Sequence, residues 1–359
     1  MDGQASEKKR WRDRLRLLPA LVVALIVAGT GIVLVPRDSG VQEPVPFSQS
    51  ARTAAYGETL ALRDSMTLLA SPAGSGAAGA ELADAVTLLT THARALLGPS
   101  TGSSPAPPAP APAATPPTAS AVVEGLAASG RRRLRDAVEA DGGMARLLAA
   151  VGTSQLLEAE RLGASFKLDL PAPEPAAKAS AAATAPQCPS ATPTSASATP
   201  AGSTRALAEA TTVSALAAAV RSEQEAVYVH QVALKRLNDA AAVTAAKNLA
   251  THEQLLQQAE SLTRLNCGDV PRREAGYRLS AEFSKDPAAS LGALESGSLP
   301  VYGDLVALSD GPARQWAVDN LLAAARRGLG WGTSVPALPG LELDVGNLPQ
   351  LPSPSSSRG

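Results

Sequence analysis

Residues 213–237, VSALAAAVRSEQEAVYVHQVALKRL, carry the clearest structural pattern in this 359-residue sequence. Apolar and titratable positions recur in it at alternating steps of three and four, at Val213, Leu216, Val220, Glu223, Val227, His230, Leu234 and Leu237. Such a seam is the side that an α-helix buries against other helices. The stretch therefore predicts a bundle helix, which we extend back to Thr204, with Glu223 and His230 on its buried side.

Three further helices are expected after this one, at residues 240–265, at 286–308 and from Asp310-Gly311-Pro312 to about Leu329. Proline is favoured in the first turn of a helix, whereas Pro300 inside the third segment predicts a kink. The connections between the four helices are short, long and short. This order is typical of a four-helix bundle with one crossover, so we expect such a bundle at residues 204–331.

The rest of the chain predicts a second set of helices and three segments that do not pack. Aromatic residues make up only 3% of the sequence, so a core of Leu, Val and Ala between helices is expected. Residues 50–165 predict a bundle with helices at 51–69, 81–97, 120–139 and 144–162 and a Pro-rich insertion at 99–118. Pro- and Ala-rich composition predicts a disordered linker at 171–203 and a disordered tail at 332–359. The fold class is therefore all-α.

The N-terminal sequence predicts a membrane anchor. Residues 1–16 are basic, and Leu17–Val35 contains no charged residue. A helix of this length rises about 28 Å, roughly the hydrocarbon thickness of a bilayer. The basic flank should stay in the cytoplasm, which places the C-terminal bulk outside the cytoplasm as part of a single-pass protein of the cell membrane. A cleaved signal peptide and a buried helix of a soluble protein are the alternatives; no A-x-A site follows the run.

Export changes the interpretation of the two cysteines. Cys188 and Cys267 lie in Pro- or Gly-flanked loop sequence. In an oxidising compartment two such cysteines can form a disulfide, and two unpaired thiols are the alternative.

The charge pattern gives no sign of a nucleic-acid partner, because the formal net charge is −1. The basic cluster of Arg131, Arg132, Arg133 and Arg135 is typical of a solvated helix face, with contact to anionic lipid or wall polymer as the alternative. The Glu- and Arg-bearing faces of the other helices are typical of ordinary solvent coverage.

The predicted second bundle resembles a ferritin-like domain family of unknown function found in exported proteins of high-GC Gram-positive bacteria. The resemblance covers about residues 204–331 and rests on helix spacing and a few polar segments. These segments are EQEAVY at 223–228, THE at 251–253, DPA at 286–288, Leu294-Glu295 and Tyr302. The resemblance implies a four-helix bundle and does not imply an activity.

A ferritin-like di-iron site needs a Glu from each of two helices and a Glu-x-x-His motif from each of the other two. Glu223, His252 and Glu295 occupy plausible ligand faces. Leu249 stands three residues before His252, and the only acid of the fourth helix is Asp319. We therefore expect no metal cofactor and a buried pairing of His252 with glutamate. The alternative is a single Fe, Mn or Zn ion held by Glu223, His252 and Glu295.

The remaining histidines suggest no catalytic site. His230 lies two turns, about 10 Å, from Glu223, too far to share one ion, so it is expected to be a core histidine. His92 is expected at the surface or between helices. The sequence contains no phosphate-binding loop, no G-x-S-x-G and no H-E-x-x-H, and we expect no catalytic residues. The expected function is non-catalytic binding or scaffolding, with a protein partner or self-association; a metal-dependent oxidoreductase or metal-binding domain is the alternative.

Overall fold

A computed structural model describes residues 45–73, 76–97, 117–168, 188 and 210–352. Within these ranges the chain forms eight α-helices, two short 3-10 helices and no strand, which confirms the all-α expectation for this part of the chain. The expected membrane helix Leu17–Val35 and the basic segment 1–16 lie outside the described residues. So do most of the Pro-rich insertion 99–118 and of the linker 171–203. None of the helices that the structure describes is long and apolar enough to span a membrane.

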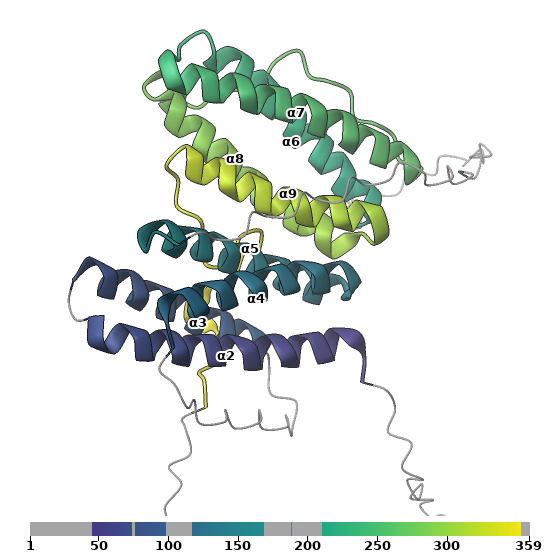
Figure 1. The fold of residues 1–359 in the computed structure, drawn as a ribbon. Coiled ribbons are helices and arrows are strands. Elements are labelled where there is room, and N and C mark those ends of the chain that lie inside the picture. The colour runs from purple at the N-terminus through teal and green to yellow at the C-terminus, as the bar shows by residue number, and fades with distance from the viewer. Residues whose placement is uncertain (1–44, 74–75, 98–116, 169–187, 189–209, 353–359) are drawn as a thin grey trace, which may run out of the picture. The chain divides into compact units, whose positions relative to one another are not determined.

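The first four helices are α2 (Phe47–Ala73), α3 (Ala77–Leu97), α4 (Ala119–Glu139) and α5 (Gly142–Ser165). Helix α2 packs against α3, and α4 packs against α5 (Figure 1). Helix α4 begins after Thr118, whose hydroxyl accepts a hydrogen bond from the Ala121 amide. Helices α4 and α5 approach so closely that a Cβ on Gly152 would lie 2.8 Å from the carbonyl oxygen of Gly130.

The second four helices are α6 (Thr212–Ala233), α7 (Asp239–Leu265), α8 (Pro287–Leu308) and α9 (Gly311–Gly330). Helix α6 packs against α7 and α8, and α8 also packs against α9. Helix α6 begins later than predicted because Thr211 and Ser214 form a capping box. Helix α8 begins after Asp286, whose carboxylate accepts from the Ala289 amide, and it continues through Pro300. These four helices position the polar cluster described below.

One apolar core joins helices of both halves. It includes Leu148 and Val151 of α5 together with Leu299 and Val306 of α8. Helix α5 packs directly against α8. The described residues of the two predicted bundles therefore share buried surface.

The segment after α9 is packed against the helices, where the sequence predicted a disordered tail from residue 332. Leu338 is 4% exposed. The carbonyl oxygen of Ala337 accepts a hydrogen bond from His92 of α3 at 2.8 Å, and that of Gly340 accepts one from Arg146 of α5 at 2.7 Å. These buried and hydrogen-bonded groups correct the prediction for residues 332–352, because a polar-looking segment can be fixed through its backbone carbonyls.

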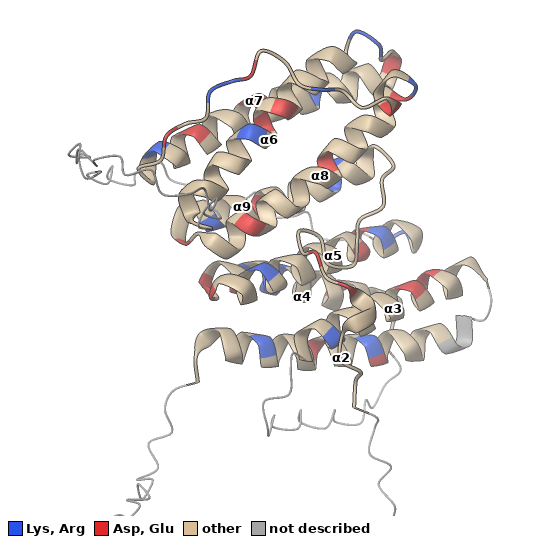
Figure 2. Ribbon diagram, turned by 180° about the vertical axis from the view of Figure 1, so that it is seen from behind, with Lys and Arg blue, Asp and Glu red and all other residues tan. Residues whose placement is uncertain are grey.

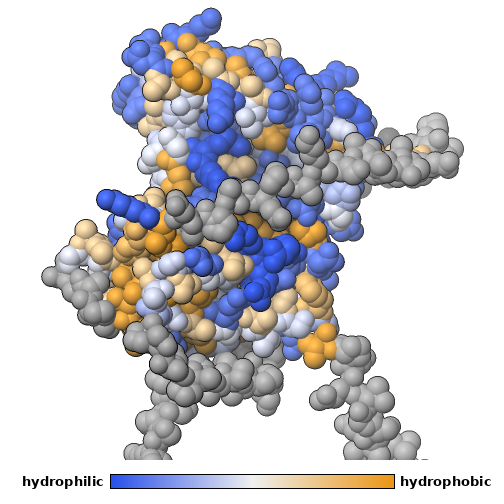
Figure 3. Space-filling model, in the orientation of Figure 1, coloured by the Kyte–Doolittle hydropathy of each residue, from blue (hydrophilic) through white to orange (hydrophobic). Residues whose placement is uncertain are grey.

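The described surface is mixed in charge and hydropathy. Figure 2 shows positive and negative residues interspersed along the helices. Figure 3 shows hydrophilic and hydrophobic residues alternating over the face in view. The large apolar side chains that are exposed come from several elements, among them Phe47 and Leu68 of α2 and Val243 of α7.

Candidate functional site

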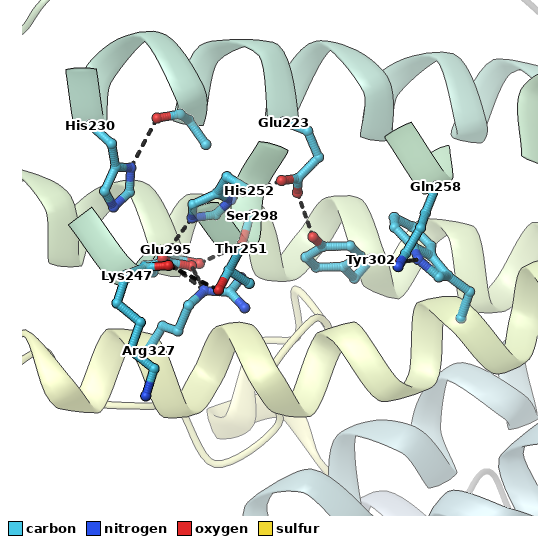
Figure 4. Close-up of polar contacts among 12 residues, drawn as sticks. Glu223, His230, Lys247, Thr251, His252, Gln258, Glu295, Ser298, Tyr302 and Arg327 are labelled. Carbon is cyan, nitrogen blue, oxygen red and sulfur yellow. Dashed lines mark hydrogen bonds and ion pairs between the residues drawn. The ribbon is translucent and has the colours of Figure 1, made fainter. Parts of the chain in front are cut away.

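A cluster of polar side chains lies inside the α6–α9 half, where the sequence places its candidate ligands. Glu223 comes from α6, His252 from α7 and Glu295 from α8, and each is at most 2% exposed (Figure 4). His252 Nδ1 lies 2.8 Å from Glu223 Oε2, and His252 Nε2 lies 3.0 Å from Glu295 Oε1. The structure therefore brings all three residues together, with the imidazole as a bridge between two carboxylates.

The bridging position favours the charged form of His252. Burial by itself lowers the pKa of an imidazole, but the hydrogen bonds and negative charges of Glu223 and Glu295 outweigh it and raise the pKa to about 9. Ionised carboxylates only accept hydrogen bonds, so both ring nitrogens of His252 act as donors. At neutral pH the bridge is an imidazolium.

Two further side chains complete the cluster. The hydroxyl of Tyr302 in α8 donates a hydrogen bond to Glu223 Oε1 at 2.5 Å. Arg327 of α9 donates through Nε to both oxygens of Glu295, at 2.9 Å each. Burial raises the pKa of Glu295, but the His252 hydrogen bond and the Arg327 charge together bring it below its usual value. Burial, followed by the charge of Glu223, raises the pKa of Tyr302 well above its usual value, so its hydroxyl stays a donor.

These groups balance in charge. The two carboxylates of Glu223 and Glu295 face one imidazolium and one guanidinium, and the sum is zero. Burying an isolated charge is costly, whereas charges that are paired and hydrogen-bonded can be accommodated. The cluster is thus electrostatically satisfied by the protein's own side chains.

His230 of α6 stacks beside this cluster, and it is fully buried. Its ring centroid lies 4.8 Å from that of His252, with the planes tilted by 41°. Its Nδ1 lies 2.9 Å from the Ala226 carbonyl oxygen, and its Nε2 has no hydrogen-bond partner among the described residues. Burial, followed by the positive charge of His252, lowers the pKa of His230 to about 4. The ring is therefore neutral at neutral pH.

The geometry changes which residues could share a metal ion. Glu223 and Glu295 contact opposite nitrogens of His252, so an ion at Nε2 would face Glu295 and not Glu223. The ligand atoms of His230, His252 and Glu295 lie within 4.8 Å of one another. The sequence-based set of Glu223, His252 and Glu295 thus comes together as a cluster. Its two carboxylates, however, lie at opposite nitrogens of the His252 ring and do not face one common ion position. His230 was missed as a candidate because only its spacing from Glu223, and not its distance from His252, could be estimated.

The fourth helix contributes a cation. The sequence did not identify this cation, Arg327, as a member of the polar cluster. A basic residue in the last turn of a helix is favoured by the helix dipole, so its presence there does not indicate a buried partner. Asp319, the acid that the sequence singled out on this helix, accepts a hydrogen bond from Gln315 at 3.0 Å instead of joining the cluster. Its pKa is raised by burial.

Outside the cluster, Arg133 differs from expectation in its burial, whereas the burial of His92 is compatible with the expected position between helices. Arg133, predicted on a solvated face, is fully buried and pairs with Glu58 of α2 at 3.0 Å and Asp136 at 2.8 Å. Its neighbour Arg132 remains largely exposed. His92 is fully buried, and burial lowers its pKa to about 4. Both side chains are held by packing between elements that a single helix pattern does not reveal.

Cys188 and Cys267 form a disulfide, with their Cα atoms 5.4 Å apart. Cys267 follows the C-terminus of α7 and has a positive φ of 59°. The bond fixes Cys188 beside the end of α7.

The fold and the cluster together define an all-helical domain with a buried, charge-balanced polar centre. Residues 215–343 match the model of a family described as a domain of unknown function, DUF4439. This range covers nearly all of α6 through α9 and the first part of the packed C-terminal segment. No curated protein and no solved structure matches the chain.

Proposed function

We propose that this chain is a single-pass membrane protein whose exported part is a ferritin-like helical module that binds a ligand or partner without catalysing a reaction on it. The observation that carries the non-catalytic part is the contact of Arg327 with Glu295, at 2.9 Å from each carboxylate oxygen. A guanidinium has five N–H donors and no acceptor, so it cannot be a metal ligand. It supplies positive charge where a second metal ion would otherwise be needed.

Oxygen chemistry at a pair of metals requires more ligands than this centre offers. Di-metal carboxylate bundles use a Glu from two helices and a Glu-x-x-His from the other two. In α7 the position three residues before His252 is Leu249, and α9 presents Arg327 to the cluster. The polar centre therefore favours binding over redox turnover.

Two features support export and anchoring. Leu17–Val35 is uncharged and preceded by a basic segment, which is typical of a membrane anchor with a cytoplasmic N-terminus. The Cys188–Cys267 disulfide is of the kind that persists in oxidising compartments. Binding or scaffolding outside the cytoplasm, with a protein partner or a second copy, is the role that fits both features.

Aerobic addition of Fe(II) to the purified full-length chain tests the absence of catalysis. We expect oxygen consumption and Fe(III) formation no faster than in buffer containing the same detergent. The matched control is Glu295→Gln, which removes the shared carboxylate charge and should leave these rates unchanged. Catalytic Fe(II) oxidation by the wild-type chain that Glu295→Gln abolishes would contradict the proposal.

A further inference from the structure

His230 presents a free lone pair to the interior of the bundle. A backbone carbonyl oxygen can only accept a hydrogen bond, so His230 Nδ1 must carry the proton in its 2.9 Å contact with Ala226. The neutral ring then has an unprotonated Nε2. That nitrogen is buried and has no hydrogen-bond partner in the described part of the chain. A histidine held at one nitrogen by a backbone carbonyl, with the other nitrogen free, has the arrangement of a metal ligand.

His252 is held at Nδ1 in the same way, with a carboxylate in place of the carbonyl, but its Nε2 is occupied by the contact with Glu295 Oε1 at 3.0 Å. Its Nδ1 donates to Glu223 Oε2 at 2.8 Å, and Tyr302 in turn donates to the other oxygen of Glu223. Carboxylate–histidine pairs of this kind orient a ring so that Nε2 can bind a metal ion. His252 Nε2 points at Glu295, on the side of the ring where a cation would have a second ligand.

We propose that His230 Nε2, His252 Nε2 and Glu295 form a site for one divalent transition-metal ion, with Glu223 as the residue that orients His252. The proposal rests on the binding function proposed above and names the ligand of the same polar centre. Two imidazoles and one carboxylate suit Fe, Mn, Co or Zn, whereas Ca and Mg prefer oxygen ligands. The ion replaces the proton on His252 Nε2, which leaves to solvent, and the Nδ1–H bond to Glu223 is kept.

The ligand atoms are near enough for small side-chain movements to close the site. They lie within 4.8 Å of one another, whereas ligands around an ion with bonds of about 2.1 Å are separated by roughly 3 to 3.5 Å. Rotamer adjustments that shorten the longest of these separations by roughly 1.3 to 1.8 Å are therefore required. Glu295 can serve the ion and Arg327 together, because a carboxylate has about four acceptor positions.

Arg327 sets the affinity through its charge. Without a metal ion, the two carboxylates, the imidazolium and the guanidinium sum to zero. With a divalent ion in place of the His252 proton, the same groups sum to +1. Removal of the guanidinium charge would restore neutrality in the metal-bound state, so Arg327 should weaken metal binding while it stabilises the metal-free cluster.

Equilibrium dialysis of the full-length chain against Co(II), followed by displacement with Zn(II), tests this site. Visible d–d absorption reports the Co(II) environment. We expect one Co(II) per chain, loss of binding in His230→Gln, and a roughly 10- to 100-fold weaker affinity in Glu223→Gln. Arg327→Gln should bind about tenfold more tightly, since a nearby like charge is removed. His92→Gln is the matched control, because His92 is an equally buried histidine outside the cluster.

A wild-type chain that binds no Co(II), or a His230→Gln chain that binds it with unchanged affinity, would overturn the assignment. Loss of binding in Glu223→Gln with full binding in His230→Gln would instead favour the carboxylate set expected from the sequence. Circular dichroism establishes that each variant is folded. Arg327→Gln keeps the test decisive if a histidine variant fails to fold, because damage alone does not raise affinity. Fe(II) oxidation would defeat the proposed function, whereas absent Co(II) binding without oxidation would defeat this inference alone.

Discussion

Arg327 Nε lies 2.9 Å from both carboxylate oxygens of Glu295, so α8 and α9 meet inside the protein through a guanidinium and a carboxylate. Glu295 is 1% exposed, and His252 contacts the same carboxylate from α7. One acidic side chain thus joins three helices. Its charge state determines both the stability of the metal-free cluster and the charge available to a bound cation.

Breaking this pair from either side should be strongly destabilising. Arg327→Met leaves Glu295 with His252 as its one charged partner, and Glu295→Gln leaves Arg327 unpaired. Each change should lower the free energy of unfolding by about 3 to 5 kcal/mol, because it leaves the buried cluster with an uncompensated charge. Urea unfolding with chelator present measures the effect. The double variant should cost less than the sum of the single costs, by roughly 1 to 3 kcal/mol. Additive losses would show that the two side chains are not coupled.

Tyr302→Phe tests the other side of the cluster. The change removes the hydroxyl that donates to Glu223 Oε1 and leaves that buried oxygen without this donor. We expect a loss of about 1 to 3 kcal/mol in the free energy of unfolding. Tyr228→Phe is the control, because the Tyr228 ring contacts Tyr277 and no hydrogen bond of its hydroxyl occurs among the described residues. The control should change stability by less than about 0.5 kcal/mol. Equal losses in the two variants would be inconsistent with a special role for the Tyr302 hydroxyl.

Much of the helical frame follows from the sequence. The seam through Val220, Glu223 and Val227 identifies the buried side of α6, and Asp286 and Asp310 mark the starts of α8 and α9. These features are local, since caps and apolar spacing act within one helix. For the same reason the sequence placed Glu223, His252 and Glu295 on inward faces, and the structure brings them together.

Contacts between helices could not be obtained in this way. A seam shows which face is buried, but it does not show which turn of α6 lies beside His252. His230 was therefore judged by its spacing from Glu223, although its ring lies 4.8 Å from that of His252. Arg133 was missed for a related reason, because its burial depends on Glu58 of α2, 75 positions away. The packing of Leu338 and its neighbours likewise depends on distant helices.

Acid should destabilise the fold partly through His92. This buried ring stays neutral down to a pKa of about 4, whereas in the unfolded chain it titrates near 6.5. Between these values the unfolded state binds more protons, so the free energy of unfolding falls as pH falls from about 6.5 towards 4. His230 contributes in the same direction.

The His92→Gln variant isolates this contribution, because the glutamine amide can still donate to the Ala337 carbonyl. Its slope of stability against pH in this window should be shallower by up to about 1.4 kcal/mol per pH unit, the value for one proton. Chemical denaturation across the window measures both slopes. An identical slope in wild type and variant would mean that His92 titrates alike in the folded and unfolded states.

The Cys188–Cys267 disulfide should stabilise the folded chain. In the chain-entropy account, a bond between cysteines 79 positions apart stabilises the folded state by about 4 kcal/mol. Cys188→Ser should therefore lower the free energy of unfolding by up to this amount, as measured under non-reducing conditions. Reductant should destabilise the wild-type chain to a similar extent and should leave Cys188→Ser unaffected.

The redox state of the same pair in the cell should depend on the N-terminal segment. We expect the native chain to remain in carbonate-washed membranes at full-length mass, with Cys188 and Cys267 linked in non-reducing mass analysis. A matched variant that lacks Leu17–Val35 would stay in the cytoplasm, where thiols are kept reduced, so both of its cysteines should react with an alkylating reagent. If the cysteines of both forms fail to react with the alkylating reagent, the disulfide forms without export. Release of the native chain as a species that begins after about residue 36 would instead identify the segment as a cleaved signal peptide.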